Sequence, residues 1–268
     1  DIFIDHEALR NAVIKIQTGF GVPETDAKTV ADCLVESNLM GIDTHGVIRL
    51  KPYMERIKAG GNNPHPNIKV IRDNVCSAVI DADNALGPVG GKYAMDLAIS
   101  KADFVGMSIV IIKNCNHYGP AGYYARMALQ HDMIGISMTN VLASMPPTGG
   151  AQAHIGNNAY SIAFPAKDEP PVVVDGATSM SSWGKLYLCK QEGVNLPEDC
   201  YVDSEGNPTV NPDDVINGGS LLPFAGHKGY GIAVAIELLT GMLGNTLLGY
   251  DIPHPYKHLD KPGGNTFF

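Results

Sequence analysis

Three side chains that could act on a small acid are spaced four residues apart in the stretch from Gly41 to Tyr53. They are His45, Arg49 and Tyr53, which point to one side if the stretch is helical or nearly so. A histidine exchanges protons near neutral pH, and an arginine can hold a carboxylate in a two-pronged grip. The pattern suits an acid with a hydroxyl or carbonyl beside its carboxylate. The plainer interpretation is a helix start with a surface histidine and arginine.

Glycines make this stretch a tight connection between helices rather than the middle of one. Gly41 and Gly46 favour turns, and Pro52 is tolerated in the first turn of a helix beginning near residues 49–50. Apolar periodicity and breakers predict helices over 5–19, 23–41 and from about 50 to 58. Asp5 is the expected cap of the first helix.

The pattern changes after residue 66, where strands and helices begin to alternate. Strands are predicted at 68–71, 77–81, 107–112, 134–140, 159–165 and 171–176, and helices through 94–99, 121–129, 180–191 and 231–242. We expect the strands at 107–112 and 134–140 and the helix at 231–242 to be buried. The turn-rich segment 197–217 is expected to wrap the surface, and a strand to begin near Phe268.

These elements predict an α/β protein with two parts. The first is a helical unit at 1–66, which C-terminal segments join and which serves substrate and interface. The second is an α/β domain at 67–268. A chain of 268 residues can bury a sizeable core as one large domain or two small ones.

Composition excludes several classes of partner. The formal net charge of −9 argues against nucleic acid, and lysines and arginines are too scattered to form a patch for membrane lipids. The N-terminus lacks the pattern of a signal peptide, and no apolar run reaches about 18 residues. The five cysteines are an odd number without Cys-x-x-Cys spacing, which favours reduced thiols and a cytoplasmic location.

Four loops next to predicted strands or helices could bind a ligand. His117 follows a buried strand, where open α/β sheets bind ligands, and is a candidate acid or base or a helix cap. The loop 139–150 is stiffened by prolines and glycines. Asp175 ends a strand and could accept from an imidazole or a ribose hydroxyl, or cap a turn. Lys228 lies among glycines ahead of a helix, an arrangement suited to phosphate.

Two common motifs are missing from the sequence. No Gly-x-Gly-x-x-Gly follows a strand, so the Rossmann fingerprint is absent. His254 and His258 have the interval of a metal pair, but the adjacent prolines forbid a regular helix there. We therefore predict no metal site.

The ordered set of motifs resembles the type II malate/L-lactate dehydrogenase family over essentially the whole chain. That family includes sulfolactate, ureidoglycolate and diketogulonate enzymes and cyclic imino acid reductases. The motifs are Asp43-Thr44-His45-Gly46 with Arg49, Asn116-His117-Tyr118-Gly119, Pro147-Thr148-Gly149-Gly150, Gly156-Asn157-Asn158, Asp175-Gly176-Ala177-Thr178-Ser179 and Gly226-His227-Lys228-Gly229-Tyr230-Gly231.

The resemblance implies an oxidoreductase that transfers hydride between NAD or NADP and a small 2-hydroxy or 2-oxo acid such as malate or lactate. It implies a non-Rossmann dinucleotide-binding domain at 67–268 and a homodimer with its active site near the subunit interface. His45 matches the acid/base histidine, and His117 the second active-site histidine, which some members use as proton acceptor. Arg49 matches the substrate-carboxylate arginine, with Tyr53 beside it. Cofactor-binding positions are Asn140, Val141, Asp175, Gly176, Ala177, Lys228 and Gly229.

The chain departs from the family pattern in four places. Thr44 replaces a common serine and keeps the hydroxyl, and Asn157-Asn158-Ala159 stands where Gly-Thr-Asn-Pro is common. Val141-Leu142 lacks the Ser-Asp of the ureidoglycolate enzymes, which argues against that substrate. The C-terminal part of the pattern is shortened. Reduction of a cyclic imino acid or a sugar-derived keto acid, or non-catalytic binding of small acids, are the alternatives.

Overall fold

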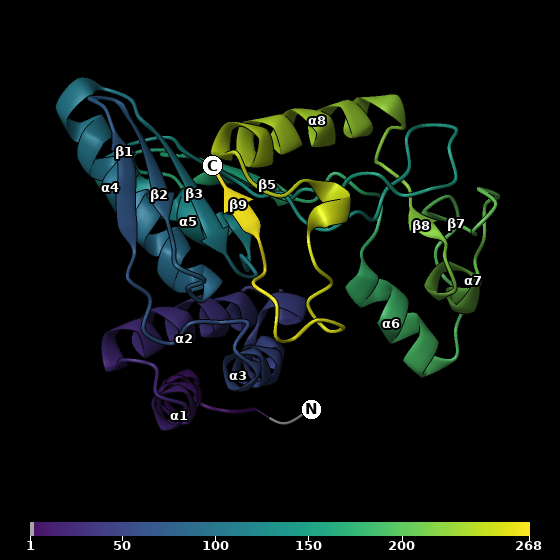
Figure 1. Ribbon diagram of the computed structural model, residues 1–268, viewed down its shortest axis with the longest axis horizontal. Helices are drawn as coiled ribbons and strands as arrows, with labels where there is room; N and C mark the ends of the chain where they lie inside the picture. Colours follow the sequence, from purple (N-terminus) through teal and green to yellow (C-terminus); the bar gives the residue numbers. More distant parts are fainter. Residues whose placement is uncertain (1–2) are drawn as a thin grey trace.

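Three N-terminal helices pack beneath a set of strands and their covering helices in the computed structural model (Figure 1), which describes residues 3–268. The helices are α1 (His6–Gly19), α2 (Glu24–Leu39) and α3 (Leu50–Ala59), as predicted. The side chain of Asp5 caps α1 by accepting a hydrogen bond from the backbone N–H of Ala8 at 2.8 Å. These helices share one core with the start of α4 (Gly87–Val105) through Leu86 and Val89.

Two groups of strands follow. The first is ordered β1-β2-β3-β9, and the second β4-β5-β6. Their bounds are β1 Lys69–Asp73, β2 Ser77–Asp81, β3 Ile109–Cys115, β9 Asn265–Phe267, β4 Gly135–Met138, β5 Tyr160–Phe164 and β6 Val172–Gly176. Strands β2 and β3 are parallel and the other neighbouring strands are antiparallel.

Strand β9 joins the two groups. It pairs with β3 on one side. On the other side, Met138 and Phe268 exchange two backbone hydrogen bonds of 2.9 Å, and Thr139 bridges Phe267. The last strand in the chain therefore lies between β3 and β4, which is visible as the yellow arrow at the centre of Figure 1.

Helices cover these strands and supply the main core. Helix α4 connects β2 to β3, and α5 (Ala121–Met127) packs against β4, β5 and β6. The buried side chains of Ile80, Ile112, Tyr124 and Phe267 meet in this core. A short 3₁₀ turn, η3 (Ala128–His131), follows α5.

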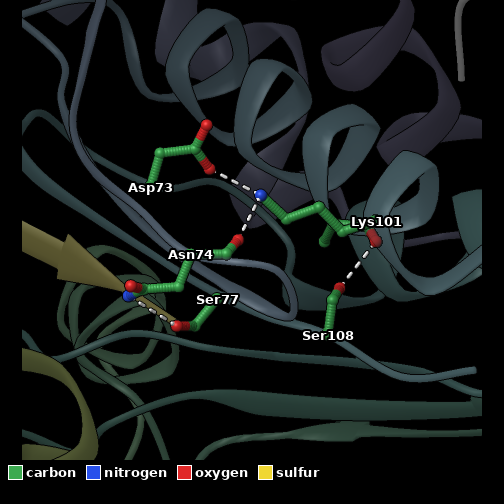
Figure 2. A network of polar contacts seen from close by, with 6 residues as sticks. Asp73, Asn74, Ser77, Lys101 and Ser108 are labelled. Carbon is green, nitrogen blue, oxygen red and sulfur yellow. Dashed lines mark hydrogen bonds and ion pairs between the residues drawn. The ribbon is translucent and has the colours of Figure 1, made fainter. Parts of the chain in front are cut away.

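Polar contacts fix the far end of α4 against the turn between β1 and β2. The ammonium of Lys101 donates to a carboxylate oxygen of Asp73 at 2.5 Å and to the backbone carbonyl of Asn74 at 2.7 Å (Figure 2). Ser108 donates to the carbonyl of Ala98 at 2.6 Å. These contacts anchor the helix at the edge of the sheet away from the candidate site.

The segment 197–217, predicted to wrap the surface, does lie mostly at the surface, but its Cys200, Tyr201 and Val215 side chains enter the small core of a separate part of the fold. This part comprises α6 (Trp183–Glu192), β7 (Tyr201–Val202), α7 (Pro212–Ile216) and β8 (Ser220–Leu221). Tyr201, Val215 and Leu221 are almost completely buried, together with Leu186 of α6. The sequence did not predict this core, because its apolar residues are separated by turn residues and are too widely spaced to show a helical or strand period.

Burial of the last long helix was overestimated. Helix α8 (His227–Glu237) continues into a π-helical turn, η4 (Leu238–Met242), and a 3₁₀ turn, η5 (Gly249–Asp251), comes later. Ile232, Leu238 and Met242 are 39%, 47% and 55% exposed. Strand β4 is likewise buried on one face only, because Ile136 is 45% exposed. The apolar sequences of α8 and β4 predicted the elements themselves, but they could not predict whether other elements cover one face or both.

Strand β3 lies two to three residues later than predicted, and Met107 remains 65% exposed. Among the helices of residues 3–268, none is both long enough and apolar enough to cross a membrane.

Candidate active site

The stretch with the histidine and arginine is not one continuous helix. Two 3₁₀ turns, η1 (Asp43–His45) and η2 (Val47–Arg49), are separated by Gly46 in an extended conformation, and α3 follows. Asn38 on α2 holds both turns, because its amide donates to Asp43 and its carbonyl oxygen accepts from the N–H of Val47. A Cβ on Gly46 would lie 2.2 Å from that oxygen. Only glycine permits this close contact.

Three predicted residues, His45, Arg49 and Tyr53, converge around a fourth, His117, which follows the end of β3. Its Nδ1 lies 2.8 Å from the hydroxyl of Tyr53, and its ring stacks on that of His45 with centroids 5.6 Å apart. Arg49 donates through Nε to the carbonyl of Thr44 at 2.6 Å. The hydroxyl of Thr44 lies 3.0 Å from Nδ1 of His45. Two segments far apart in sequence thus build one cluster.

Burial and a nearby cation keep both imidazoles neutral. Burial, reinforced by the Arg49 cation, lowers the pKa of His45 to about 4. The pKa of His117 lies well below its ordinary value, mainly through burial and then through Arg49 and His45. Burial raises the pKa of Tyr53, so it stays an uncharged phenol. Neutral imidazoles beside a fixed cation can accept a proton from a bound anion.

The hydroxyl of Tyr256 also reaches this cluster, which the sequence did not predict. It accepts a hydrogen bond from Nη1 of Arg49 although 207 residues separate the two. Tyr256 lies in a proline-rich segment without periodicity, so no sequence pattern singles it out. Arg49 keeps donors on its guanidinium beyond those used for Thr44 and Tyr256. A carboxylate could therefore bind there.

The predicted cofactor residues at the end of β6 lie near this cluster. Asp175 accepts a hydrogen bond from the backbone N–H of Gly122 at the start of α5, and burial raises its pKa. Burial, and after it the charge of Asp175, raises the pKa of Tyr118, the neighbour of His117 in the sequence. Gly176 is exposed, and a Cβ there would meet no atom within 4 Å.

Two of the predicted cofactor segments lie side by side. The N–H of Phe224 donates to the carbonyl of Thr178 at 3.0 Å, which brings the Asp175–Ala177 segment next to the turn before α8. Lys228 is exposed in the first turn of that helix. Gly229 is buried against Phe224, whose carbonyl oxygen would be 2.2 Å from an added Cβ.

Asn140 and Val141 lie at the other end of α8, in a network centred on Glu237. This carboxylate is 5% exposed and accepts from the side chains of Asn140 and Asn158, at 3.3 and 2.8 Å, and from the N–H of Gly249 at 3.0 Å. The N–H of Val141 donates to Asn158 at 3.1 Å. The side chain of Asn140 is completely buried, so it holds the loop in place.

Glu237 was not predicted from the sequence, although one feature of the sequence points to it. It is the single charged residue between Lys228 and Asp251, in an otherwise apolar run. Burying a lone charge in such a run is unfavourable unless hydrogen bonds inside the core offset the loss of hydration. Lys228 and Glu237 lie nine residues apart on one helix, hence about 14 Å apart at 1.5 Å per residue. An elongated ligand could therefore contact the loops at both ends of α8.

A separate cleft of about 1060 Å³ lies between the C-terminal segment and the part containing β7 and β8. His254, His258, Lys261 and Ser220 are in its lining. None of the site residues predicted from the sequence lines this cleft within the described chain. We therefore place the candidate active site at the His117 cluster, which contains the two imidazoles and the Arg49 guanidinium.

Comparisons with known proteins agree with this geometry. The profile of the family described as malate/L-lactate dehydrogenase matches residues 4–268. The chain is 45% identical to a malate dehydrogenase of Pyrococcus horikoshii, over 99% of this chain and 74% of that protein. It is 42% identical to an L-sulfolactate dehydrogenase of Methanocaldococcus jannaschii, over 88% and 68%. The solved structure of sulfolactate dehydrogenase from that organism superposes with a TM-score of 0.90 at 39% identity, covering 99% of this chain and 77% of that one.

Proposed function

Because the chain belongs to the malate/L-lactate dehydrogenase family, we propose that its His117 cluster interconverts a small 2-hydroxy acid and the matching 2-oxo acid. The protein is an enzyme of the 2-hydroxy acid dehydrogenase type that uses a nicotinamide cofactor. The observation that carries the proposal is a pair of neutral imidazoles beside the free donors of Arg49.

Each residue of the cluster has a separate task in this reaction. Arg49 pairs with the substrate carboxylate and aligns C2. His117 accepts the hydroxyl proton as the C2 hydrogen leaves with its electron pair, and it returns that proton to the oxygen in the reverse direction. The nicotinamide, when bound, accepts or supplies the hydride.

His117 is our choice of proton acceptor over His45. Its Nδ1 is held by Tyr53, which is 3% exposed and uncharged, so an N–H at Nδ1 can donate to the phenol oxygen and leave Nε2 as the base. His45 is held only by the exposed Thr44 hydroxyl. A buried partner fixes a ring orientation better than an exposed one.

The residues at both ends of α8 fit an elongated dinucleotide. Lys228 lies in the first turn of this 11-residue helix, where the helix dipole is positive, and suits phosphate. The open backbone at Gly176 gives access beside Asp175. Val141 and its loop would lie on the nicotinamide side. We leave NAD and NADP as the two cofactors to be compared.

A substrate panel tests the function directly. Pyruvate, oxaloacetate, 3-sulfopyruvate and a cyclic imino acid would each be mixed with NADH and with NADPH, and the loss of nicotinamide absorbance followed. We expect turnover of at least one 2-oxo acid and preference for one cofactor. Activity with the imino acid alone would replace the proposal by imine reduction. Absence of turnover across the panel would instead favour a module that only binds small acids.

A further inference from the structure

Arg56 is a buried cation that forms no salt bridge in the described part of the chain, although the charge of Asp260 lies near enough to oppose the lowering of its pKa by burial. It is 4% exposed, and its guanidinium donates to five oxygens, all of them amide or backbone carbonyl. These are Asn62 Oδ1 at 3.1 Å, Asn116 Oδ1 at 3.1 Å, and the carbonyls of Pro255, His258 and Lys261 at 3.0, 3.1 and 2.6 Å. Every N–H donor of the group is therefore used inside the protein.

Three of those carbonyls belong to one segment, residues 253–262, which we call the strap. The strap is drawn in yellow beside α3 in Figure 1. Prolines at 253, 255 and 262 restrict its backbone. Nδ1 of His254 accepts from the N–H groups of Tyr256 and Lys257 at 3.2 and 3.3 Å, which fixes the turn that carries Tyr256. The strap is therefore held by side chains rather than by a sheet or helix.

Arg56 also connects the strap to the loop after β3 that carries His117. Its second contact, Asn116, precedes His117 and donates to the carbonyls of Asn84 and Ala85 at 2.7 and 3.0 Å. The N–H of Gly263, just beyond the strap, donates to the same Asn116 oxygen at 2.9 Å. One guanidinium thus sets the position of Tyr256 relative to His117.

The hydroxyl of Tyr256 is placed to take part in binding. It accepts a hydrogen bond from Arg49, so its own hydrogen remains available to a ligand. The side chain is 49% exposed and open to solvent. A carboxylate that reaches the remaining donors of Arg49 would meet this hydroxyl beside them.

We propose that Tyr256 is a substrate-binding residue, which donates its hydroxyl hydrogen to the carboxylate held by Arg49, and that Arg56 is the positioning residue that holds the strap in place. This inference rests on the proposed function, because it places the substrate carboxylate at Arg49. It adds a binding group from the strap to a site otherwise built from α3, η2 and the loop after β3.

The test compares Tyr256→Phe with wild type in steady-state kinetics on the best 2-oxo acid of the panel. We expect KM to rise about 10- to 100-fold, the effect of one hydrogen bond to a charged group. We expect kcat to change by less than about threefold, because the lost contact binds substrate and transition state alike. The Kd of the reduced cofactor should stay unchanged. Tyr93→Phe, at an exposed tyrosine of α4, is the matched control and should leave KM unchanged.

Two further variants test the positioning role of Arg56. Arg56→Lys should raise KM while cofactor Kd stays constant, and combining it with Tyr256→Phe should give less than the product of the two effects, because both act through one contact. Pro255→Gly loosens the strap while keeping the backbone carbonyl at position 255 that accepts from Arg56, and it should also raise KM. A full multiplicative effect in the double variant would overturn the role of Arg56.

Arg49→Lys separates this inference from the function beneath it. Should Tyr256→Phe keep the wild-type KM while Arg49→Lys raises it, Tyr256 is not a binding residue and the proposed function stands. Should both variants keep the wild-type KM, the carboxylate does not bind at Arg49, and both proposals fail.

Discussion

The side chains of the candidate site already have the protonation states that the proposed reaction needs before substrate binds. Burial, reinforced by the Arg49 cation, lowers the pKa of both His45 and His117, and burial keeps Tyr53 uncharged. A neutral base beside a cation is the state needed to oxidise a hydroxy acid anion.

Replacing His117 by Asn should remove proton transfer while keeping a polar side chain. We expect kcat for hydroxy acid oxidation to fall by about 10²- to 10⁴-fold, the usual loss of general acid–base help, with cofactor Kd unchanged. His45→Asn is the comparison, and its loss should be smaller. A large loss in His45→Asn with near-normal turnover in His117→Asn would exchange the two roles.

The pH profile of oxidation should extend further into acid than an ordinary histidine allows. An imidazole with a lowered pKa stays in its basic form until the pH falls through that lowered value. The kcat/KM of oxidation should therefore remain constant from pH 8 through 6.5 and fall only at a pH well below the ordinary pKa of histidine, where His117 gains its proton. Measuring kcat/KM across that range tests this, and an acid limb near 6.5 would contradict it.

We propose that helix α8 relates the two ends of the bound cofactor. Its first turn carries Lys228, and its last turn carries Glu237, which fixes Asn140 and Asn158. The loop after β6 pairs with the segment before this helix. The loops assigned to the nucleotide thus share one rigid support.

Lys228→Ala should weaken cofactor binding more than it slows a saturated turnover. One charge-assisted contact is worth on the order of 1.5–3 kcal/mol, which corresponds to roughly a 10- to 100-fold rise in Kd. Titration of protein fluorescence with the reduced cofactor measures this, with Lys167→Ala at an exposed, distant lysine as control. An unchanged Kd would remove Lys228 from the site.

Local sequence patterns predicted those elements whose formation depends on neighbours in the chain. Strand β2 was predicted with its observed bounds, and the helices that begin at a cap or end at a glycine were close. What escaped prediction depends on distant partners. The contacts of Tyr256 with Arg49 and of Arg56 with the strap span about 200 residues, and no periodicity encodes them. The histidines that we propose as catalytic were predicted from their residue type, which limits the chemistry they can perform.

The sheet β4-β5-β6 leaves apolar side chains exposed on one face, which is typical of a surface that binds a partner. Ile136 and Val174 flank Ile162 in one cross-strand row and are 45% and 46% exposed, while Val172 nearby is 58% exposed. Apolar rows of this kind on a sheet mark interaction surfaces. We propose that the protein is a homodimer.

Sedimentation at micromolar concentration should give the mass of two 28.5 kDa chains. The mass should not change with moderate salt, because an apolar contact is little screened. A single-chain mass under these conditions would refute the dimer. Ile136→Lys, compared with the same change at the exposed Val75, tests whether the sheet face is the contact.

The position of β9 also bears on how the polypeptide acquires its structure during synthesis. Strands β3 and β4 leave the ribosome well over a hundred residues before the strand that separates them. Until then, each presents an open edge of unpaired backbone groups, which other chains can join. Contacts between residues so distant in sequence also form slowly. The edges of β3 and β4 in the nascent chain therefore stay unpaired until β9 has been synthesised. A chaperone that binds during this interval would protect the chain from aggregation.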